Sequence, residues 1–192
     1  MSLTLFLPAF LLVGAGASAA PGEIREPVID QDEVTEVTLK AVLIGKLVSY
    51  VDWPKERFEG RKDPLIVGVF GKDPFGELLD EACKKQVYKG RKIEIRRFPK
   101  GLESEGFEAC HVLFIPAREV EHLPAVAKRL GGKSVMLVGD STGFAIKGGA
   151  LNFYRKDKNI AFEINPDAVK REKLKMSADL LKLARIVRDE KE

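Results

Sequence analysis

The chain has 192 residues, with 32 Lys and Arg against 29 Asp and Glu and a formal net charge of +3. A charge this small, spread along the chain, gives no electrostatic basis for binding nucleic acid, and no heptad run or collagen-like repeat is present. The roughly 170 residues that follow the first apolar segment are enough for one compact domain with its own core.

The chain begins with an uncharged apolar segment. Leu3–Val13 has the length of the apolar region of a secretory signal peptide, and Ala17 and Ala19 follow as a small-residue cleavage pattern. An uncleaved anchor is the alternative, but the apolar run is short for a membrane-spanning helix and Pro8 interrupts it. We therefore expect an exported protein, with a signal peptide at 1–19, an N-terminal extension at 20–33 and a single domain at 34–188.

The first half of this domain predicts helices and strands in alternation. Apolar residues three and four apart, Leu39 and Val42 among them, predict a first helix with one buried stripe. A continuous apolar run predicts a strand that is buried on both faces. Asp73 is the expected N-cap of the second helix, with Pro74 at its first position. The predicted elements are a helix over Val34–Val51 ended by Trp53-Pro54, a strand over Leu65–Phe70, a helix to Lys85 with Leu78, Leu79 and Ala82 inward, and a strand over Ile93–Phe98.

The second half of the domain continues the alternation of strands and helices, which then gives way to a β-hairpin and two final helices. Two more apolar runs predict strands, and Gly131-Gly132 ends the helical stretch between them. The predicted elements are a strand over His111–Ile115, a helical stretch over Ala117–Leu130 split by Pro124, a strand over Ser134–Val138, a β-hairpin of Ala150–Tyr154 with Asn159–Ile164, and helices over Pro166–Lys173 and Ser177–Arg188. The pattern predicts a three-layer α/β fold, with a largely parallel sheet, helices on both faces and a C-terminal antiparallel hairpin extension.

The two cysteines are a candidate disulfide in an exported domain. Cys83 lies near the end of the second predicted helix and Cys110 precedes the third strand, which places both at the same edge of the sheet in a right-handed arrangement. Two buried free cysteines are the alternative. The sequence has neither a CxxC pair nor zinc-ligand spacing, so we expect no metal or other cofactor.

Two loops at the carboxyl ends of strands are candidate ligand loops. One contains Asp73, and the other contains Ser141 and Thr142. Ligands bind at this edge of open α/β sheets, but the same residues also favour plain turns, which is the preferred interpretation. His111 and His122 have no adjacent nucleophile and orienting carboxylate, so no catalytic set is predicted and we expect a protein that is not an enzyme.

Aromatic residues outside the parallel strands are the candidate partner interface, because aromatic side chains are favoured in interfaces. They follow the first helix or belong to the hairpin, and core packing is the alternative for each of them. These candidates are Tyr50, Trp53, Phe58, Phe153 and Tyr154.

Several segments together resemble the YfiR family of periplasmic regulators, in an order and spacing that span about Leu39 to Val187. The first helix departs from this resemblance at Ile44-Gly45-Lys46. The matching segments are Leu39-Lys40-Ala41 through Trp53-Pro54, Gly71–Gly76, Cys110–Ile115, Gly148–Phe153, Phe162–Asn165, Leu174–Ser177 and Leu180–Arg185.

The resemblance implies a function that composition does not. Such proteins bind the periplasmic domain of an inner-membrane diguanylate cyclase and restrain it, which lowers cyclic di-GMP and biofilm formation, and an outer-membrane lipoprotein can sequester them. The resemblance also leaves other signalling partners and a homodimer open. A periplasmic small-ligand binding or sensor module is the alternative function, and a hydrolase is the weakest interpretation.

Overall fold

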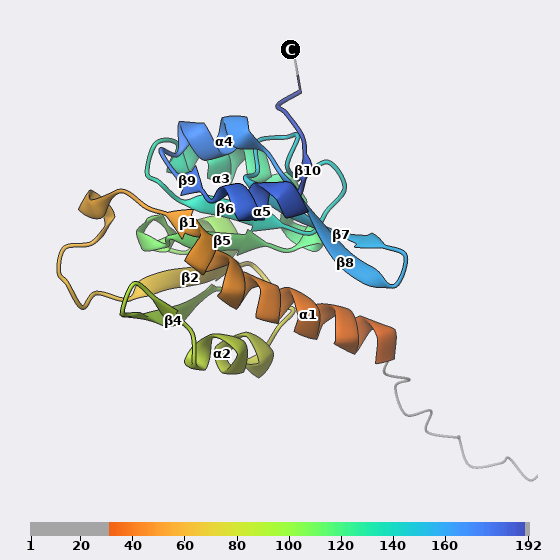
Figure 1. Ribbon diagram of the computed structural model, residues 1–192, viewed down its shortest axis with the longest axis horizontal. Helices are drawn as coiled ribbons and strands as arrows, with labels where there is room; N and C mark the ends of the chain where they lie inside the picture. The colour runs from red at the N-terminus through yellow and green to blue at the C-terminus, as the bar shows by residue number, and fades with distance from the viewer. Residues whose placement is uncertain (1–30, 191–192) are drawn as a thin grey trace, which may run out of the picture.

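The computed structural model describes residues 31–190, so the expected signal peptide at 1–19 and most of the extension at 20–33 lie outside the described residues. It has a mixed α/β fold built on a curled eight-stranded sheet with the order β10-β8-β7-β6-β5-β2-β4-β3 (Figure 1). All neighbouring strands are parallel except the pairs β7–β8 and β3–β4.

The elements of the first half match the predicted alternation closely. The buried strand predicted at Leu65–Phe70 has those bounds, as strand β2. The elements are α1 (Gln31–Leu47), a 3-10 helix (Val48–Tyr50), β1 (Val51–Asp52), β2 (Leu65–Phe70), α2 (Glu77–Lys84), β3 (Val87–Tyr88) and β4 (Arg91–Phe98).

In the second half, Pro124 lies in the first turn of α3 and the preceding stretch Ala117–His122 is a 3-10 helix. Gly132 ends this helix with a positive φ of 75°. The elements are β5 (Val112–Ile115), α3 (Leu123–Leu130), β6 (Met136–Gly139), β7 (Leu151–Lys156), β8 (Asn159–Ile164), α4 (Pro166–Arg171), β9 (Lys175–Met176), α5 (Ala178–Leu183) and β10 (Arg185–Ile186).

The sheet separates two apolar clusters. Along β2, Leu65, Val67 and Val69 belong to one cluster, while Ile66 and Phe70 belong to the other. Because alternate side chains of a strand point to opposite faces, the two clusters lie on the two sides of the sheet. Helices α1 and α2 cover the first cluster and α3 covers the second (Figure 1). Helices α4 and α5 add buried residues to the first cluster, so the two helical layers are unequal.

Helix α2 begins later than the sequence predicts. Asp73 is not its N-cap: the Asp73 Oδ1 accepts a hydrogen bond from the Phe75 N–H at 2.7 Å, which closes a turn before the helix. This local bond competes with helix formation, and the helix begins at Glu77 after Gly76, whose φ is 53°. Leu78, predicted to point inward, is therefore 40% exposed, while Leu79 is buried.

The last predicted helix is also shorter than expected. The Ser177 hydroxyl accepts from the Leu180 N–H and caps α5, but the helix ends at Leu183. Arg185 and Ile186 form β10, which pairs in parallel with β8. The antiparallel pair β7–β8 is therefore followed by a further strand on its outer side, because pairing with β8 satisfies the backbone groups that a longer helix would have paired internally.

The two cysteines lie on opposite sides of the sheet rather than together at one edge. Both are free and buried, Cys83 in the first cluster and Cys110 in the second. Burial raises the pKa of the Cys83 thiol to about 11 and that of the Cys110 thiol to about 12. The structure thus shows no disulfide, and two buried, unreactive thiols take its place.

Helices α1 and α2 approach closely at Gly45. A Cβ atom at Gly45 would lie 3.3 Å from the Ala82 carbonyl oxygen and 3.3 Å from the Cys83 Sγ. The glycine in the segment Ile44-Gly45-Lys46 therefore permits the contact that holds α2 against α1.

Candidate functional site

Two of the five aromatic residues predicted at an interface belong to the core. Trp53 is 5% exposed and Phe153 is 1% exposed. The Trp53 indole N–H donates to the His111 carbonyl oxygen at 3.1 Å, and its ring packs edge-on against Tyr88. The prediction that Trp53 and Phe153 contact a partner is therefore wrong, and the alternative of core packing holds for both.

The other three aromatic residues are more accessible. Tyr50 is 46% exposed and follows α1 directly. Phe58 and Tyr154 are half-buried, with the Arg91 and Arg185 guanidinium groups over their rings. Only Tyr50 presents a large part of its side chain to solvent.

His111 is a structural residue beneath this aromatic group. Its Nδ1 accepts from the Ile66 N–H at 3.0 Å, and Phe58 stacks on its ring at 4.5 Å between centroids. Burial, together with the positive charge of Arg57, lowers the pKa of His111 to about 4. His111 is therefore neutral at ordinary pH and fixes the beginning of β2.

The three residues predicted to belong to ligand loops differ in their surroundings. The Asp73 Oδ2 pairs with the Arg97 Nε at 2.6 Å, Thr142 is exposed, and the half-buried Ser141 has an Oγ without a hydrogen-bond partner. The cavity at this edge of the sheet is lined instead by neighbours of these residues, among them Pro74 and Asp140.

This cavity, here called the switch-point cavity, measures about 480 Å³. Strand β2 lies between β4 and β5. The chain therefore continues from β2 to β4 on one side of β2 and then crosses back to β5 on its other side. Open α/β sheets bind ligands outside the carboxyl ends of strands at such a reversal of strand order. The cavity is lined by Glu36, Val37, Lys40, Pro74, Pro116, Ala117, Arg118, Asp140 and Arg155.

A buried ion cluster forms one wall of the cavity. Lys40 of α1 is only 8% exposed, and its Nζ lies 2.7 Å from the Glu36 Oε1 and 2.8 Å from the Asp140 Oδ2. The Asp140 Oδ1 accepts from the Ala117 N–H at 2.7 Å. Burial alone would lower the pKa of Lys40, but the hydrogen bonds and charges of Asp140 and Glu36 outweigh it and raise that pKa above its ordinary value.

Sequence reasoning missed Lys40 because it placed Leu39 and Val42 on the buried stripe of the first helix. In the structure Leu39 is 41% exposed and Val42 is 36% exposed, while Lys40 and Ala41 are buried. The signal was available in the spacing, since Lys40 lies three residues after Val37 and four before Ile44, both of which pack against the core.

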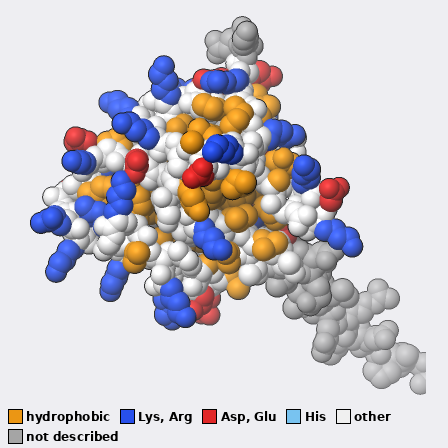
Figure 2. All heavy atoms as spheres, in the orientation of Figure 1, with side chains coloured by type: hydrophobic (Ala, Val, Ile, Leu, Met, Phe, Trp, Pro, Cys, Tyr) orange, Lys and Arg blue, Asp and Glu red, His pale blue; other side chains and the backbone are white. Residues whose placement is uncertain are grey.

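An exposed apolar surface lies on the outer side of the same helix. We define the α1–α5 face by Leu39 and Val42 of α1, Tyr50, and Leu183 of α5, which is 77% exposed. The Tyr50 carbonyl oxygen accepts from the Ser177 N–H at 2.9 Å, which places Tyr50 beside the start of α5. Figure 2 shows hydrophobic side chains gathered on the side where Figure 1 places α1 and α5, with many Lys and Arg around them.

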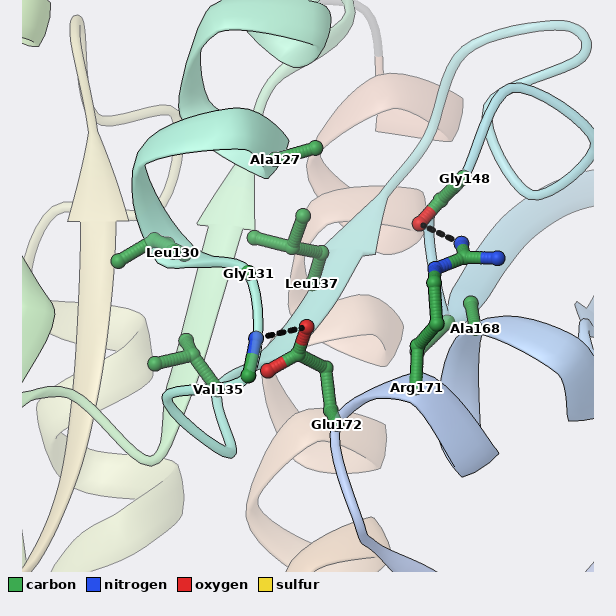
Figure 3. Close-up of a pocket in the computed structure, with 11 residues that line it drawn as sticks. Ala127, Leu130, Gly131, Val135, Leu137, Gly148, Ala168, Arg171 and Glu172 are labelled. Atoms are coloured by element: carbon green, nitrogen blue, oxygen red, sulfur yellow. Dashed lines mark hydrogen bonds between the residues drawn. The ribbon is translucent and has the colours of Figure 1, made fainter.

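A second cavity, of about 290 Å³, lies between α3 and α4 and is mostly apolar. Figure 3 shows Glu172 and Arg171 at its edges. The Glu172 carboxylate accepts from the backbone N–H groups of Gly132 and Ser134, and Arg171 donates to the Gly148 carbonyl oxygen and pairs with Asp189. The charged groups at the edges of this cavity already have hydrogen-bond or ion-pair partners within the protein. Their role is therefore to connect loops and not to bind a ligand.

Within residues 31–190, no group of His, Cys, Asp and Glu side chains is arranged to hold a metal ion. In the same range, no helix has the length and apolar character needed to cross a membrane.

The comparison with known families gives one match. The model of the family described as YfiR/HmsC-like matches residues 37–185, from the first turns of α1 to the first residue of β10. No protein with a curated description matches the chain.

The ion cluster predicts a stability difference between two lysines of α1. Lys40→Met removes the cation between Glu36 and Asp140 and should lower the free energy of unfolding by about 3 kcal/mol, because it leaves two half-buried carboxylates without the buried cation that they share. Lys46→Met, at an exposed position of the same helix, should change it by less than about 0.5 kcal/mol. Urea unfolding measures both, and equal effects would contradict the assigned role of Lys40.

His111 predicts a loss of stability in mild acid. The unfolded chain protonates this histidine near its ordinary pKa of about 6.5, whereas the folded chain protonates it only near 4. Stability should therefore fall as the pH drops from about 6.5 to 4, by about 3 kcal/mol from this group. Urea unfolding at several pH values should show a shallower dependence for His111→Gln than for the wild type. A His111→Gln profile parallel to that of the wild type would refute the assignment.

Proposed function

The chain belongs to the YfiR/HmsC-like family, and from this membership we propose that it is an exported regulator that binds the periplasmic domain of an inner-membrane diguanylate cyclase and holds the cyclase inactive. Its action would lower cyclic di-GMP and biofilm formation. An outer-membrane lipoprotein would compete for the regulator and release the cyclase. The family match over residues 37–185 is the observation that carries this proposal.

The α1–α5 face supports the proposal as the partner-binding surface. Exposed apolar side chains that gather on one side, with charge around them, are typical of protein interaction sites. Leu39, Val42, Tyr50 and Leu183 supply the apolar part. Figure 2 shows Lys and Arg side chains around the hydrophobic ones on this side of the molecule, which favour an acidic partner surface. Of these four residues, Tyr50 is the one that the sequence analysis also predicts at a partner interface.

Inhibition by such a protein needs no catalytic group. A regulator depletes the active conformation of its partner when it binds the inactive conformation more tightly, and the shift is limited by the difference between the two affinities. A rigid domain with an exposed face can provide that difference. A homodimer formed through the same face would compete with the partner for the regulator, because both would bury the same apolar residues.

A small-ligand sensor is the second candidate function. The switch-point cavity favours it, since the cavity lies where α/β sheets bind ligands and a buried ion cluster forms its wall. The two functions are compatible in one protein, because α1 contributes to the cavity with Lys40 and to the α1–α5 face with Leu39.

The proposal predicts a change in cyclic di-GMP. Deleting the gene in the native host should raise cellular cyclic di-GMP, and expression of the wild-type protein should restore the original level. The variant Leu39→Asp should fail to restore it, because a charge at the centre of an apolar interface costs about 2 kcal/mol or more of binding. Leu78→Asp is the matched control, since Leu78 has similar exposure on α2, outside the α1–α5 face, and this variant should restore the level.

Two measurements keep the outcomes distinct. The thermal midpoints of Leu39→Asp and Leu78→Asp should stay close to that of the wild type, since both positions are exposed. An unchanged cyclic di-GMP level in the deletion strain would refute the cyclase as partner. Full restoration by a folded Leu39→Asp variant would instead remove the α1–α5 face from the interface.

A further inference from the structure

The switch-point cavity combines features from five separate parts of the fold. Helix α1 contributes Glu36 and Lys40, the segments after β2, β5 and β6 contribute Pro74, Arg118 and Asp140 with their neighbours, and β7 contributes Arg155. Three carboxyl ends of neighbouring parallel strands thus open into one space. The position of the cavity therefore follows from the order of the strands in the sheet and not from the conformation of a single loop.

The charges around the cavity are unequal. Three cationic side chains, Lys40, Arg118 and Arg155, line it against two carboxylates, Glu36 and Asp140. Both carboxylates bind Lys40, and Asp140 also accepts from the Ala117 N–H. Both carboxylates are therefore engaged within the wall, and among the described lining residues the cationic groups outnumber the carboxylates by one.

The two arginines lie at the solvent side of the cavity. Both are exposed, and Arg118 forms no ion pair with the side chains that the structure describes. Arg155 lies 3.8 Å from the Glu36 Oε2 and donates to the Asp157 carbonyl oxygen. A guanidinium group presents a planar set of donors that matches carboxylate and phosphate oxygens, so an anion entering here would find complementary groups.

The wall behind the arginines supplies a further donor and apolar contacts. Lys40 has three N–H donors, and two of them point to Glu36 and Asp140. Val37, Pro74 and Pro116 provide apolar surface beside it. A volume of about 480 Å³ lies within the range of small-molecule sites. This combination of donors and apolar surface suits a small organic molecule that carries an anionic group.

We propose that the switch-point cavity binds a small anionic compound, whose carboxylate or phosphate group is held by Arg118 and Arg155. The site shares Pro74 and Asp140 with the two loops that the sequence predicts as ligand loops, but its cationic side chains Lys40, Arg118 and Arg155 come from outside those loops. It also stands independently of the proposed partner, because nothing in its lining requires a second protein.

The test uses inorganic phosphate and succinate as probes. Backbone amide shifts of the protein are followed by NMR while each probe replaces chloride at constant ionic strength, which separates binding from general salt effects. Saturable shifts are expected at Ala117, Arg118 and Asp140. Saturation by phosphate alone or by succinate alone would support the proposal and identify the anionic group.

Matched variants locate the binding. Arg118→Gln and Arg155→Gln should each raise the dissociation constant of the probe at least five-fold, and the double variant should show no saturable shifts. Arg61→Gln is the control, since Arg61 is an exposed arginine in a different cavity, and it should bind like the wild type. Shifts that fail to saturate with either probe, or equal affinities for all variants, would overturn the proposal. Neither result would bear on the cyclic di-GMP experiment, so failure of this site is distinguishable from failure of the regulatory function.

Discussion

The ion pair between Lys40 and Asp140 is the contact on which the arrangement of the N-terminal helix depends. It joins α1 to the carboxyl end of β6 across 100 positions of sequence, and Glu36 completes the cluster from one turn earlier in α1. Burying these charges is costly unless each has partners, and the hydrogen bond from the Ala117 N–H to Asp140 also fixes the segment that follows β5. The cluster therefore acts together with the buried side chains of Ala41, Ile44 and Leu47, which face the sheet from the same helix.

Two functional surfaces follow from this orientation. With Lys40 and Ala41 directed inward, Leu39 and Val42 must point outward, so α1 displays an apolar face that the core does not use. The same turn of the helix closes the switch-point cavity through Glu36, Val37 and Lys40. A ligand in the cavity and a partner on the face would thus contact opposite sides of one helix, which gives the regulator and sensor functions a common structural element.

The sequence predicts the parallel strands well, because a continuous run such as Leu65–Phe70 is buried on both faces and fits few other structures. It predicts less where two local preferences compete. Asp73 can cap a helix or close a turn, and the residues after Leu183 can extend a helix or pair with β8; tertiary contacts decide both cases. Trp53 shows the same limit, since an aromatic residue beside a helix end fits an interface as well as a core until the strand that covers it is known.

The most direct test of the account places a photo-crosslinking amino acid at Leu39 of the protein in the native host, with the same substitution at Leu78 as the control. The account predicts that illumination joins the Leu39 variant to an inner-membrane protein that carries a cyclase domain, and that the Leu78 variant gives no such product. A crosslink to that protein from Leu78 but not from Leu39 would contradict the assignment of the α1–α5 face. Absence of any membrane-protein product from either position, with both variants folded and exported, would contradict the proposal that the domain acts by binding a membrane partner through this surface.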